Sequence, residues 1–459
     1  MRDAPKFSLV LLAAALGLAE TRAELPELAG AATVAPAGIE SFRQVVGNAG
    51  MSRRARFSFG KIQFNTEWDP APGQVPANDG LGPVFNAIAC AACHINNGRG
   101  APPATKDEEF DALLVRLSIS GTGPQGQPLP VPGYGDQLQH RGIEGVPGEG
   151  NARLIYETIN GQYADGTEYQ LRKPVLEIYD LAFGQLPDET MYSLRIANPV
   201  MGLGLLEAVP ESALLELADP TDENKDGISG RINCVWSPTE NAMAVGRFGW
   251  KANVANIAEQ NAGAALGDMG ITTTLLAKDN CEPEQRACRE ASELHTEEIE
   301  FQDDFFKELT RYVRLLGVPR QRGSDSADVQ AGNRLFTQLG CTGCHAPTLV
   351  TGENASFTEL AEQTIHPYTD LLLHDMGPGL ADGRPDFEAT GSEWRTAPLW
   401  GIGLTADVGG FESYLHDGRA RSLSEAILWH GGEAKNTRNA FAALPIADRE
   451  QLLRFLKSL

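Results

Sequence analysis

The chain has 459 residues, too many for one ordinary domain, and 42% of them are hydrophobic, which is enough for sizeable cores. Its formal net charge of −23 argues against nucleic acid or an anionic membrane surface as a partner. The 49 glycines and 28 prolines predict long ordered loops around the helices.

The first residues are typical of a signal peptide. Arg2 and Lys6 precede an apolar run at 7–18, which is too short to span a bilayer as a helix. Small residues that suit a cleavage site follow, as Thr21 and Ala23 or as Gly17 and Ala19. We predict cleavage after Ala23, so that 1–23 is a signal peptide and the mature protein is periplasmic without a stable membrane span.

Two copies of Cys-x-x-Cys-His carry the clearest chemistry. The first consists of Cys90, Cys93 and His94, and the second of Cys341, Cys344 and His345. Two thiols one helical turn apart can bond both vinyl groups of one porphyrin, and the adjoining His then reaches the iron. A zinc site needs its cysteine pairs close in sequence, and a redox dithiol does not need the His twice. The motifs therefore predict two covalent c-type haems, one in each half, with His94 and His345 as iron ligands.

Between the two motifs the pattern changes from helix to strand. Residues 115–119 alternate like a strand, and residues 121–135 form a loop rich in Gly and Pro. Asp165-Gly166, within 163–171, marks a hairpin turn. The first half is thus predicted to be helical with a small β insertion.

An acidic run near the middle of the chain fits the first half of a calcium loop. Asp222, Asn224 and Asp226 offer oxygen ligands at alternate positions, and Gly227 takes the sixth position. The twelfth position holds Asn233 where an EF-hand has Glu, so a full EF-hand is not expected. A calcium site and a plain Asx-rich turn both fit these residues.

Three cysteines lie outside the haem motifs. Cys281 and Cys288 are close together in a loop-like run, which favours a disulfide in an oxidising compartment. That pairing leaves Cys234 as a free buried thiol, and a disulfide between Cys234 and either of the others is the alternative.

The polar stretch 319–326 contains Pro and Gly and is the predicted domain boundary. It separates an N-terminal haem domain with the β insertion, 24–318, from a C-terminal cytochrome-c-like haem domain, 319–459. Helices are expected around the boundary and at the end of the chain, at 303–316, 327–339 and 446–459.

The second haem has several possible sixth ligands. They are His374, Met376, His416 and His430. Residues 423, 426, 427 and 430 fall on one helix face, which favours His430 and a bis-histidine iron. The alternatives are that His430 only forms a hydrogen bond in the core, and that Met376, another type of axial ligand, binds the iron.

Several further motifs resemble a known superfamily. The second half resembles the bacterial diheme cytochrome c peroxidase and MauG-type superfamily, and the chain from about Ser41 onward is similar to its diheme oxidoreductase branch, sometimes labelled thiol oxidoreductase-like. The motifs are GPVFN at 82–86, DGISGR at 226–231, GRFGWK at 246–251, LLLHDMG at 371–377, WRTAPLW at 394–400 and LHDGR at 415–419. The resemblance implies a mainly α fold of two cytochrome-c-like haem domains packed face to face.

The resemblance also implies catalytic residues at the N-terminal haem. In diheme peroxidases this haem activates peroxide, and a Gln and an acid on its distal side follow a Trp that lies between the haems. Trp250 and Gln260 stand ten residues apart, as in the family. Asp268 comes two residues earlier than the family's acid and is Asp in place of Glu.

Other positions gain a role from the same resemblance. The superfamily carries Met or Tyr as distal ligand where this chain has His430. The His of its LHDGR motif, here His416, is implied to be a structural residue or one that supports an iron ligand. It often holds a calcium between the haem domains, which favours calcium at Asp222, Asn224 and Asp226.

The leading expectation is a peroxidase-like oxidoreductase, in which an electron-transfer haem feeds an open haem that activates hydrogen peroxide. A small redox protein would supply the electrons. The alternatives are MauG-like oxidation of a partner protein and a non-enzymatic diheme electron carrier in periplasmic metal handling. After His94 the next histidine is His140, so no nearby sixth ligand is evident, and an open iron favours chemistry over electron transfer.

Overall fold

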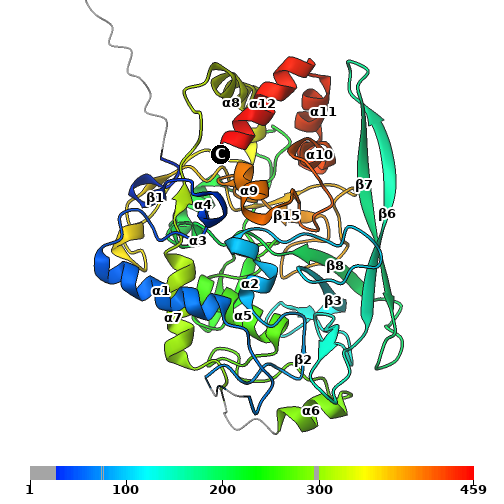
Figure 1. Cartoon of the computed structure of the whole chain (residues 1–459). Helices are drawn as coiled ribbons and strands as arrows, with labels where there is room; N and C mark the ends of the chain where they lie inside the picture. Colours follow the sequence, from blue (N-terminus) through cyan, green and yellow to red (C-terminus); the bar gives the residue numbers. More distant parts are fainter. Residues whose placement is uncertain (1–26, 74, 76, 294–298) are drawn as a thin grey trace, which may run out of the picture.

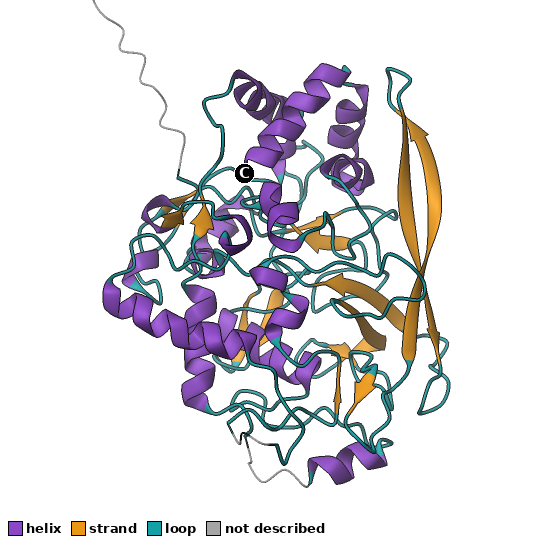
Figure 2. Cartoon of the chain, viewed as in Figure 1, coloured by secondary structure: helices purple, strands orange, loops and turns teal. Residues whose placement is uncertain are grey.

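The computed structural model describes residues 27–73, 75, 77–293 and 299–459, so the predicted signal peptide lies outside the described residues. Most helices gather on one side of the molecule, and the longest strands form the opposite side (Figures 1 and 2). Most of the buried apolar side chains of both halves join in one continuous cluster. No helix in these ranges is long and apolar enough to cross a membrane.

The α-helices of the described residues are α1 (Met51–Asn65), α2 (Cys90–Cys93), α3 (Leu203–Glu207), α4 (Glu211–Leu217), α5 (Ile257–Met269), α6 (Arg286–Ser292), α7 (Asp303–Arg314), α8 (Ala327–Gln338), α9 (Thr405–Gly409), α10 (Leu423–Trp429), α11 (Lys435–Ala443) and α12 (Ile446–Ser458). The strands are β1 (Thr33–Val34), β2 (Val84–Phe85), β3 (Leu113–Thr122), β4 (Pro128–Leu129), β5 (Arg141–Gly142), β6 (Asn151–Gln162), β7 (Glu168–Tyr179), β8 (Met191–Ile196), β9 (Cys234–Ser237), β10 (Ala242–Val245), β11 (Val318–Pro319), β12 (Leu349–Val350), β13 (Thr364–Ile365), β14 (Leu373–Asp375) and β15 (Glu393–Arg395).

The three helices predicted around the boundary and at the end of the chain are confirmed as α7, α8 and α12. In α7, Phe306, Leu309 and Val313 are buried on one face. Asp303 in the first turn and Arg314 in the last turn complement the helix dipole.

Two helix pairs support the regions around the Cys-x-x-Cys-His motifs. Helix α1 packs across α7, and α8 packs across α12. A glycine lies at each crossing: a Cβ on Gly60 would come 2.1 Å from the carbonyl oxygen of Glu308, and a Cβ on Gly332 would come 2.1 Å from that of Gln451. The helices can approach this closely because glycine has no side chain.

The longest strands form the predicted hairpin. β6 and β7 pair antiparallel from Asn151 opposite Tyr179 to Gln162 opposite Glu168, and this hairpin stands along one side of the molecule (Figure 1). The turn is at Asp165-Gly166, as predicted, and Asp165 Oδ1 accepts a hydrogen bond from the Thr167 amide at 3.0 Å. The strand predicted at 115–119 lies within β3, which pairs with β4 and β8.

The expected mainly α fold is wrong. The structure is 31% helical and 20% strand, with strands in both halves. The β insertion is larger than predicted, and the long loops pair in short hairpins such as β9–β10 and β14–β15. Loops that cross a core must pair their backbone amides and carbonyls. Strands of two to four residues do this, but they are too short to leave a periodic sequence signal.

Candidate functional site

The first Cys-x-x-Cys-His motif lines a cavity of about 410 Å³. Cys90 and Cys93 belong to the short helix α2, and His94 follows directly. His94 Nδ1 donates a hydrogen bond to the carbonyl oxygen of Asn198 at 2.7 Å, and the Phe64 ring of α1 lies 6.0 Å from the His94 ring. Because Nδ1 carries the proton, Nε2 has a free lone pair for a metal.

The second motif lines a separate cavity of about 190 Å³ with the same local design. His345 Nδ1 donates to the carbonyl oxygen of Tyr368 at 2.9 Å, and the Phe336 ring of α8 lies 6.2 Å from the His345 ring. In both cavities a phenylalanine of a packed helix and one backbone carbonyl hold the histidine, and Nε2 is left free.

His430 lines the same cavity as His345. The sequence predicted His430 on a face of helix α10, within its last turn. Helix α10 instead ends at Trp429, and His430 is the first residue beyond it. Its Nδ1 donates to the carbonyl oxygen of Ala426 at 2.7 Å. His430 therefore also has a free Nε2 at the wall of this cavity.

His374 has no free ring nitrogen. Its Nε2 lies 2.8 Å from Asp370 Oδ2, and its Nδ1 lies 2.8 Å from Glu433 Oε2. Burial opposes a charge on the ring, but the hydrogen bonds with Asp370, Cys344 and Glu433 outweigh burial and raise the pKa of His374 to about 12. This imidazolium is unsuited to bind iron.

The other two candidate ligands, His416 and Met376, have different surroundings from His374. His416 is 5% exposed and stacks on Trp394, with 3.7 Å between the ring centroids, which fits the expected structural role. Burial lowers the pKa of His416 to about 4, so the ring is neutral. Met376 is half-buried and lines the cavity, so it remains the alternative to His430.

The residues around both cavities fit a bound haem. Each cavity presents two cysteine thiols one turn apart and a histidine with a free Nε2. Each also has buried polar atoms without a hydrogen-bond partner: Gln260 Oε1 in the first, and Arg99 Nε and Nη1 in the second. Buried polar groups normally have partners, so these atoms indicate contacts with a ligand.

Helix α5 carries the predicted distal residues along one face. Gln260, Ala264 and Asp268 follow each other at four-residue spacing, and all three line the N-terminal cavity. The helix begins where Asn256 Oδ1 accepts a hydrogen bond from the Glu259 amide at 3.0 Å. The structure thus brings Gln260 and Asp268 to the cavity that contains His94.

Asp268 is tied to a polar chain that the sequence did not reveal. Arg116 Nη1 donates to Gln137 Oε1 at 3.1 Å, and Gln137 Nε2 donates to Asp268 Oδ1 at 2.9 Å. Burial outweighs these contacts and raises the pKa of Asp268 to about 6. Asp268 can therefore gain or lose a proton near neutral pH.

Glu149 is a second acid of this cavity that was not predicted. It is 1% exposed, and its carboxylate accepts hydrogen bonds from the Gln139 amide at 2.6 Å and from Gln285 Nε2 at 2.5 Å. Burial raises the pKa of Glu149 to about 8. Like Arg116 and Gln137, it comes from the β-rich insertion, where no motif or spacing marks it.

Trp250 lies between the two cavities and lines both. Its Nε1 donates to the carbonyl oxygen of Ile196 at 2.9 Å, and its own carbonyl accepts from the Arg395 amide at 2.9 Å. Arg395 also lines both cavities. The tryptophan expected between the two haems therefore lies where the two cavities share a wall.

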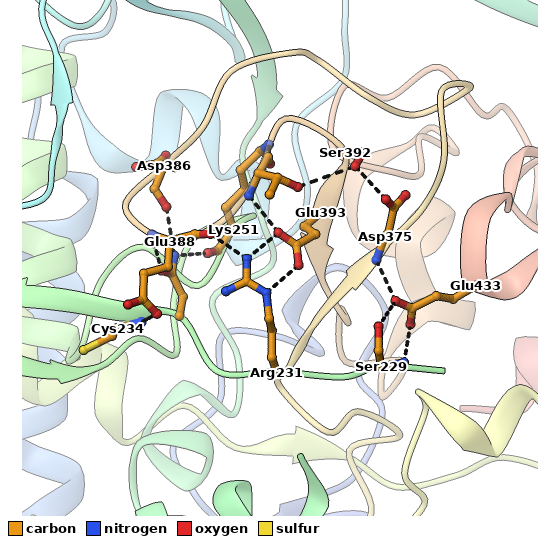
Figure 3. A network of polar contacts seen from close by, with 12 residues as sticks. Ser229, Arg231, Cys234, Lys251, Asp375, Asp386, Glu388, Ser392, Glu393 and Glu433 are labelled. Atoms are coloured by element: carbon orange, nitrogen blue, oxygen red, sulfur yellow. Dashed lines mark hydrogen bonds and ion pairs between the residues drawn. The ribbon is translucent and has the colours of Figure 1, made fainter. Parts of the chain in front are cut away.

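A polar network fixes the β14–β15 hairpin (Figure 3), and this hairpin carries Arg395 to the shared wall. Arg231 Nε and Nη2 bind the two oxygens of Glu393 at 2.6 and 2.5 Å. Ser229 Oγ donates to Glu433 Oε1 at 2.8 Å, three residues beyond His430. The network thus couples the hairpin to the segment that presents His430.

Lys251, next to Trp250, is fully buried and reaches the loop before β15. Its Nζ donates to the carbonyl oxygens of Thr390 and Arg384 at 2.7 and 2.9 Å and to Asp382 Oδ1 at 2.9 Å. Nζ also lies 4.4 Å from the centre of the Trp394 ring. The GRFGWK motif contains Lys251, but its sequence alone did not reveal this anchoring role.

The acidic run at 222–227 forms a turn of Asx type. The Asp226 amide donates to Asn224 Oδ1 at 2.8 Å, and the Gly227 amide donates to Asp222 Oδ1 at 3.2 Å. Within the described ranges, no three His, Cys, Asp or Glu side chains are grouped as metal ligands. Calcium at this loop stays a prediction.

The cysteines outside the motifs follow the first of the two predictions. Cys281 and Cys288 form a disulfide, and Cys234 is free. Cys234 is half-buried at the start of β9 and is not enclosed as expected.

Two cavities that each carry a Cys-x-x-Cys-His motif define a di-haem protein. Residues 24–459 match the family described as "Di-haem oxidoreductase, putative peroxidase", and the chain belongs to this family. The protein is therefore an oxidoreductase of a family that uses two haems.

No curated protein matches the chain. Among solved structures, hydrazine synthase of Kuenenia stuttgartiensis, pressurized with 20 bar xenon, matches with 12% identity over 100% of both chains and a TM-score of 0.35, too low to support an argument.

Proposed function

We propose that the protein is an exported periplasmic peroxidase with two covalently attached c-type haems. Hydrogen peroxide reacts in the N-terminal cavity, and electrons arrive through the C-terminal cavity. One observation carries this proposal, the asymmetry of the two cavities. His345 and His430 both line the C-terminal one, whereas His94 is the only histidine among the described residues that line the N-terminal one. Two protein ligands suit electron transfer, and a free iron position suits chemistry.

In the N-terminal cavity, Cys90 and Cys93 would hold a haem covalently and His94 Nε2 would bind its iron, which supplies the redox chemistry. The carboxylate of Asp268 takes a proton from one oxygen of the peroxide and returns it to the other. Gln260 Oε1 has no hydrogen-bond partner, so it can accept the O–H of the oxidant and orient it.

The source of electrons is a small redox protein. The net charge of −23 favours a partner with a basic surface, because opposite charges speed the encounter. Trp250 lies where both cavities share a wall, and its ring is the proposed relay between them.

Covalent attachment can be tested by mass. The mature protein, produced with haem-attachment machinery, should exceed its polypeptide mass by two haems, which denaturation does not release. Replacing Cys341 and Cys344 together with Ala should remove one haem and leave the haem at Cys90 and Cys93. A protein with the mass of the bare chain would contradict the proposal.

The peroxidase activity is tested by mixing the reduced holoprotein with hydrogen peroxide in a stopped-flow spectrometer. We expect rapid oxidation of the N-terminal haem, followed by oxidation of the C-terminal haem, and turnover when a reduced small redox protein is added. If peroxide oxidises neither haem, the diheme electron carrier becomes the better description.

If Trp250 is the relay, replacing it should affect oxidation of the C-terminal haem but not the reaction of the N-terminal haem with peroxide. In Trp250→Phe, reaction with peroxide should stay fast, while oxidation of the C-terminal haem should slow, because the indole that both cavities share is lost. Trp394 is a matched control, since it is also buried but lines the C-terminal cavity alone. Equal slowing of the second step in Trp394→Phe would argue against a specific relay.

Calcium binding is the remaining prediction for the loop with Asp222, Asn224 and Asp226. Elemental analysis of the purified protein should find calcium at a molar ratio close to that of the chain, and Asp222→Ala should remove it. A metal-free protein whose haem spectra do not respond to chelators would assign the loop to the Asx-type turn alone.

A further inference from the structure

Buried arginines in this protein normally pair with a carboxylate. Four of the buried arginines form such ion pairs: Arg195 and Arg384 with Asp386, Arg419 with Asp417, and Arg449 with Asp165. Two others, Arg99 and Arg395, have no carboxylate partner in the described part of the chain. A buried cation without an anion is costly, so these two arginines require an explanation.

The two exceptions lie at the candidate haem cavities, but they differ in their hydrogen bonds. Arg395 Nε and Nη1 donate to the carbonyl oxygens of Gly249 and Thr396 at 2.9 and 3.2 Å. Arg99 Nε and Nη1 are buried and have no hydrogen-bond partner at all. Arg99 is therefore the stronger indication of a missing anion.

Arg99 is 6% exposed and lines the C-terminal cavity, although it follows His94 of the N-terminal motif by only five residues. Its guanidinium lies 5.6 Å from the centre of the Trp250 ring and 5.9 Å from that of Tyr414. Burial lowers the pKa of Arg99 to about 10, which still leaves the side chain charged at neutral pH. Two aromatic rings thus flank a charged group at the cavity wall.

We propose that Arg99 binds a propionate of the C-terminal haem. This inference rests on haem attachment in the proposed function, and not on its peroxidase activity. A haem carries two propionate carboxylates, and a guanidinium offers the donors that match a carboxylate. The pair supplies both the anion that the buried Arg99 lacks and the acceptors for its free Nε and Nη1.

The pairing has an electrostatic consequence for the C-terminal haem. The positive charge of Arg99 offsets the negative charge of the propionate and so favours the reduced iron, which has one positive charge less. Without Arg99 the propionate charge would favour the oxidised iron. Arg99 therefore raises the midpoint potential of a haem that the other half of the chain holds.

The test is a spectroelectrochemical titration of the di-haem holoprotein and its variants. In Arg99→Met, the ratio of reduced to oxidised C-terminal haem at a given potential should fall about tenfold, which corresponds to about 59 mV for one electron. The N-terminal haem should shift less. Arg99→Lys keeps the charge and should stay close to the wild type.

Arg449→Met is the matched control, because Arg449 is equally buried but pairs with Asp165. It should leave both potentials unchanged. Resonance Raman spectra of the wild type and Arg99→Lys give a second readout, since the propionate bending band should shift when the guanidinium is replaced. This comparison also serves if Arg99→Met does not fold.

Two results would overturn the proposal: an unchanged potential of the C-terminal haem in Arg99→Met, or an unchanged propionate band in Arg99→Lys. Failure of the wild type to react with peroxide would refute the peroxidase activity and leave the pairing intact. The two proposals can therefore fail separately.

Discussion

The reaction of the holoprotein with hydrogen peroxide is expected to slow about 10²–10⁴-fold when Asp268 is replaced by Asn, the usual contribution of a general acid–base group. Asn has nearly the same shape and can still accept from Gln137 Nε2, but it cannot carry a proton between the two peroxide oxygens. Stopped-flow oxidation of the reduced protein measures the effect. Binding of carbon monoxide to the reduced N-terminal haem should survive the change, because it needs no proton transfer.

The pH dependence gives a second signature of the same residue. Burial raises the pKa of Asp268 to about 6, and the ionised form is the one that can take a proton from peroxide. The rate should therefore be highest above pH 6 and should fall as the pH drops through 6. In Asp268→Asn this step in the profile should disappear.

Glu149 provides the comparison that can contradict this assignment. It lines the same cavity and is also buried, but burial raises its pKa to about 8. Glu149→Gln should leave most of the peroxide reaction intact. If Glu149→Gln slows the reaction strongly and Asp268→Asn does not, the proton carrier is Glu149.

The second large effect is expected at His430. If His345 and His430 both bind the C-terminal iron, His430→Ala should convert this haem from low-spin to high-spin and open it to small ligands. His430→Met should raise its midpoint potential by part of the range of about 0.8 V that axial ligands span, because thioether ligation favours reduced iron. Electron spin resonance and redox titration measure these changes.

Met376 decides the interpretation of the His430 variants. It lines the same cavity, so an unchanged low-spin signal in His430→Ala would transfer the ligand role to Met376. Met376→Leu keeps the size of the side chain and removes the sulfur, and it should leave the wild-type spectrum unchanged if His430 is the ligand.

The sequence could predict features whose signal is local. The Cys-x-x-Cys-His motifs, the Cys281–Cys288 disulfide and the helices α7, α8 and α12 each depend on residues within a few turns of one another. The Asp165-Gly166 turn is equally local, and the structure confirms it. The placement of Gln260 and Asp268 on one face of α5 follows from helical spacing once the helix is known.

The features that sequence reasoning missed depend on contacts between distant segments. Arg116, Gln137 and Glu149 reach the N-terminal cavity only because the β insertion folds against α5. Arg99 reaches the C-terminal cavity from a loop in the other half. Some of the short strands also pair with partners far away in sequence, as in the pair β1–β11.

The shared wall bears on how this protein can be engineered. Arg99 and Trp250, from before residue 319, line the cavity of His345, and Arg395, from after it, lines the cavity of His94. A cut at the predicted boundary would leave each cavity with part of its lining on the other fragment. The two halves are therefore not independent modules. A chimaera with a foreign C-terminal half would need an arginine and a tryptophan in its N-terminal half that match the foreign cavity.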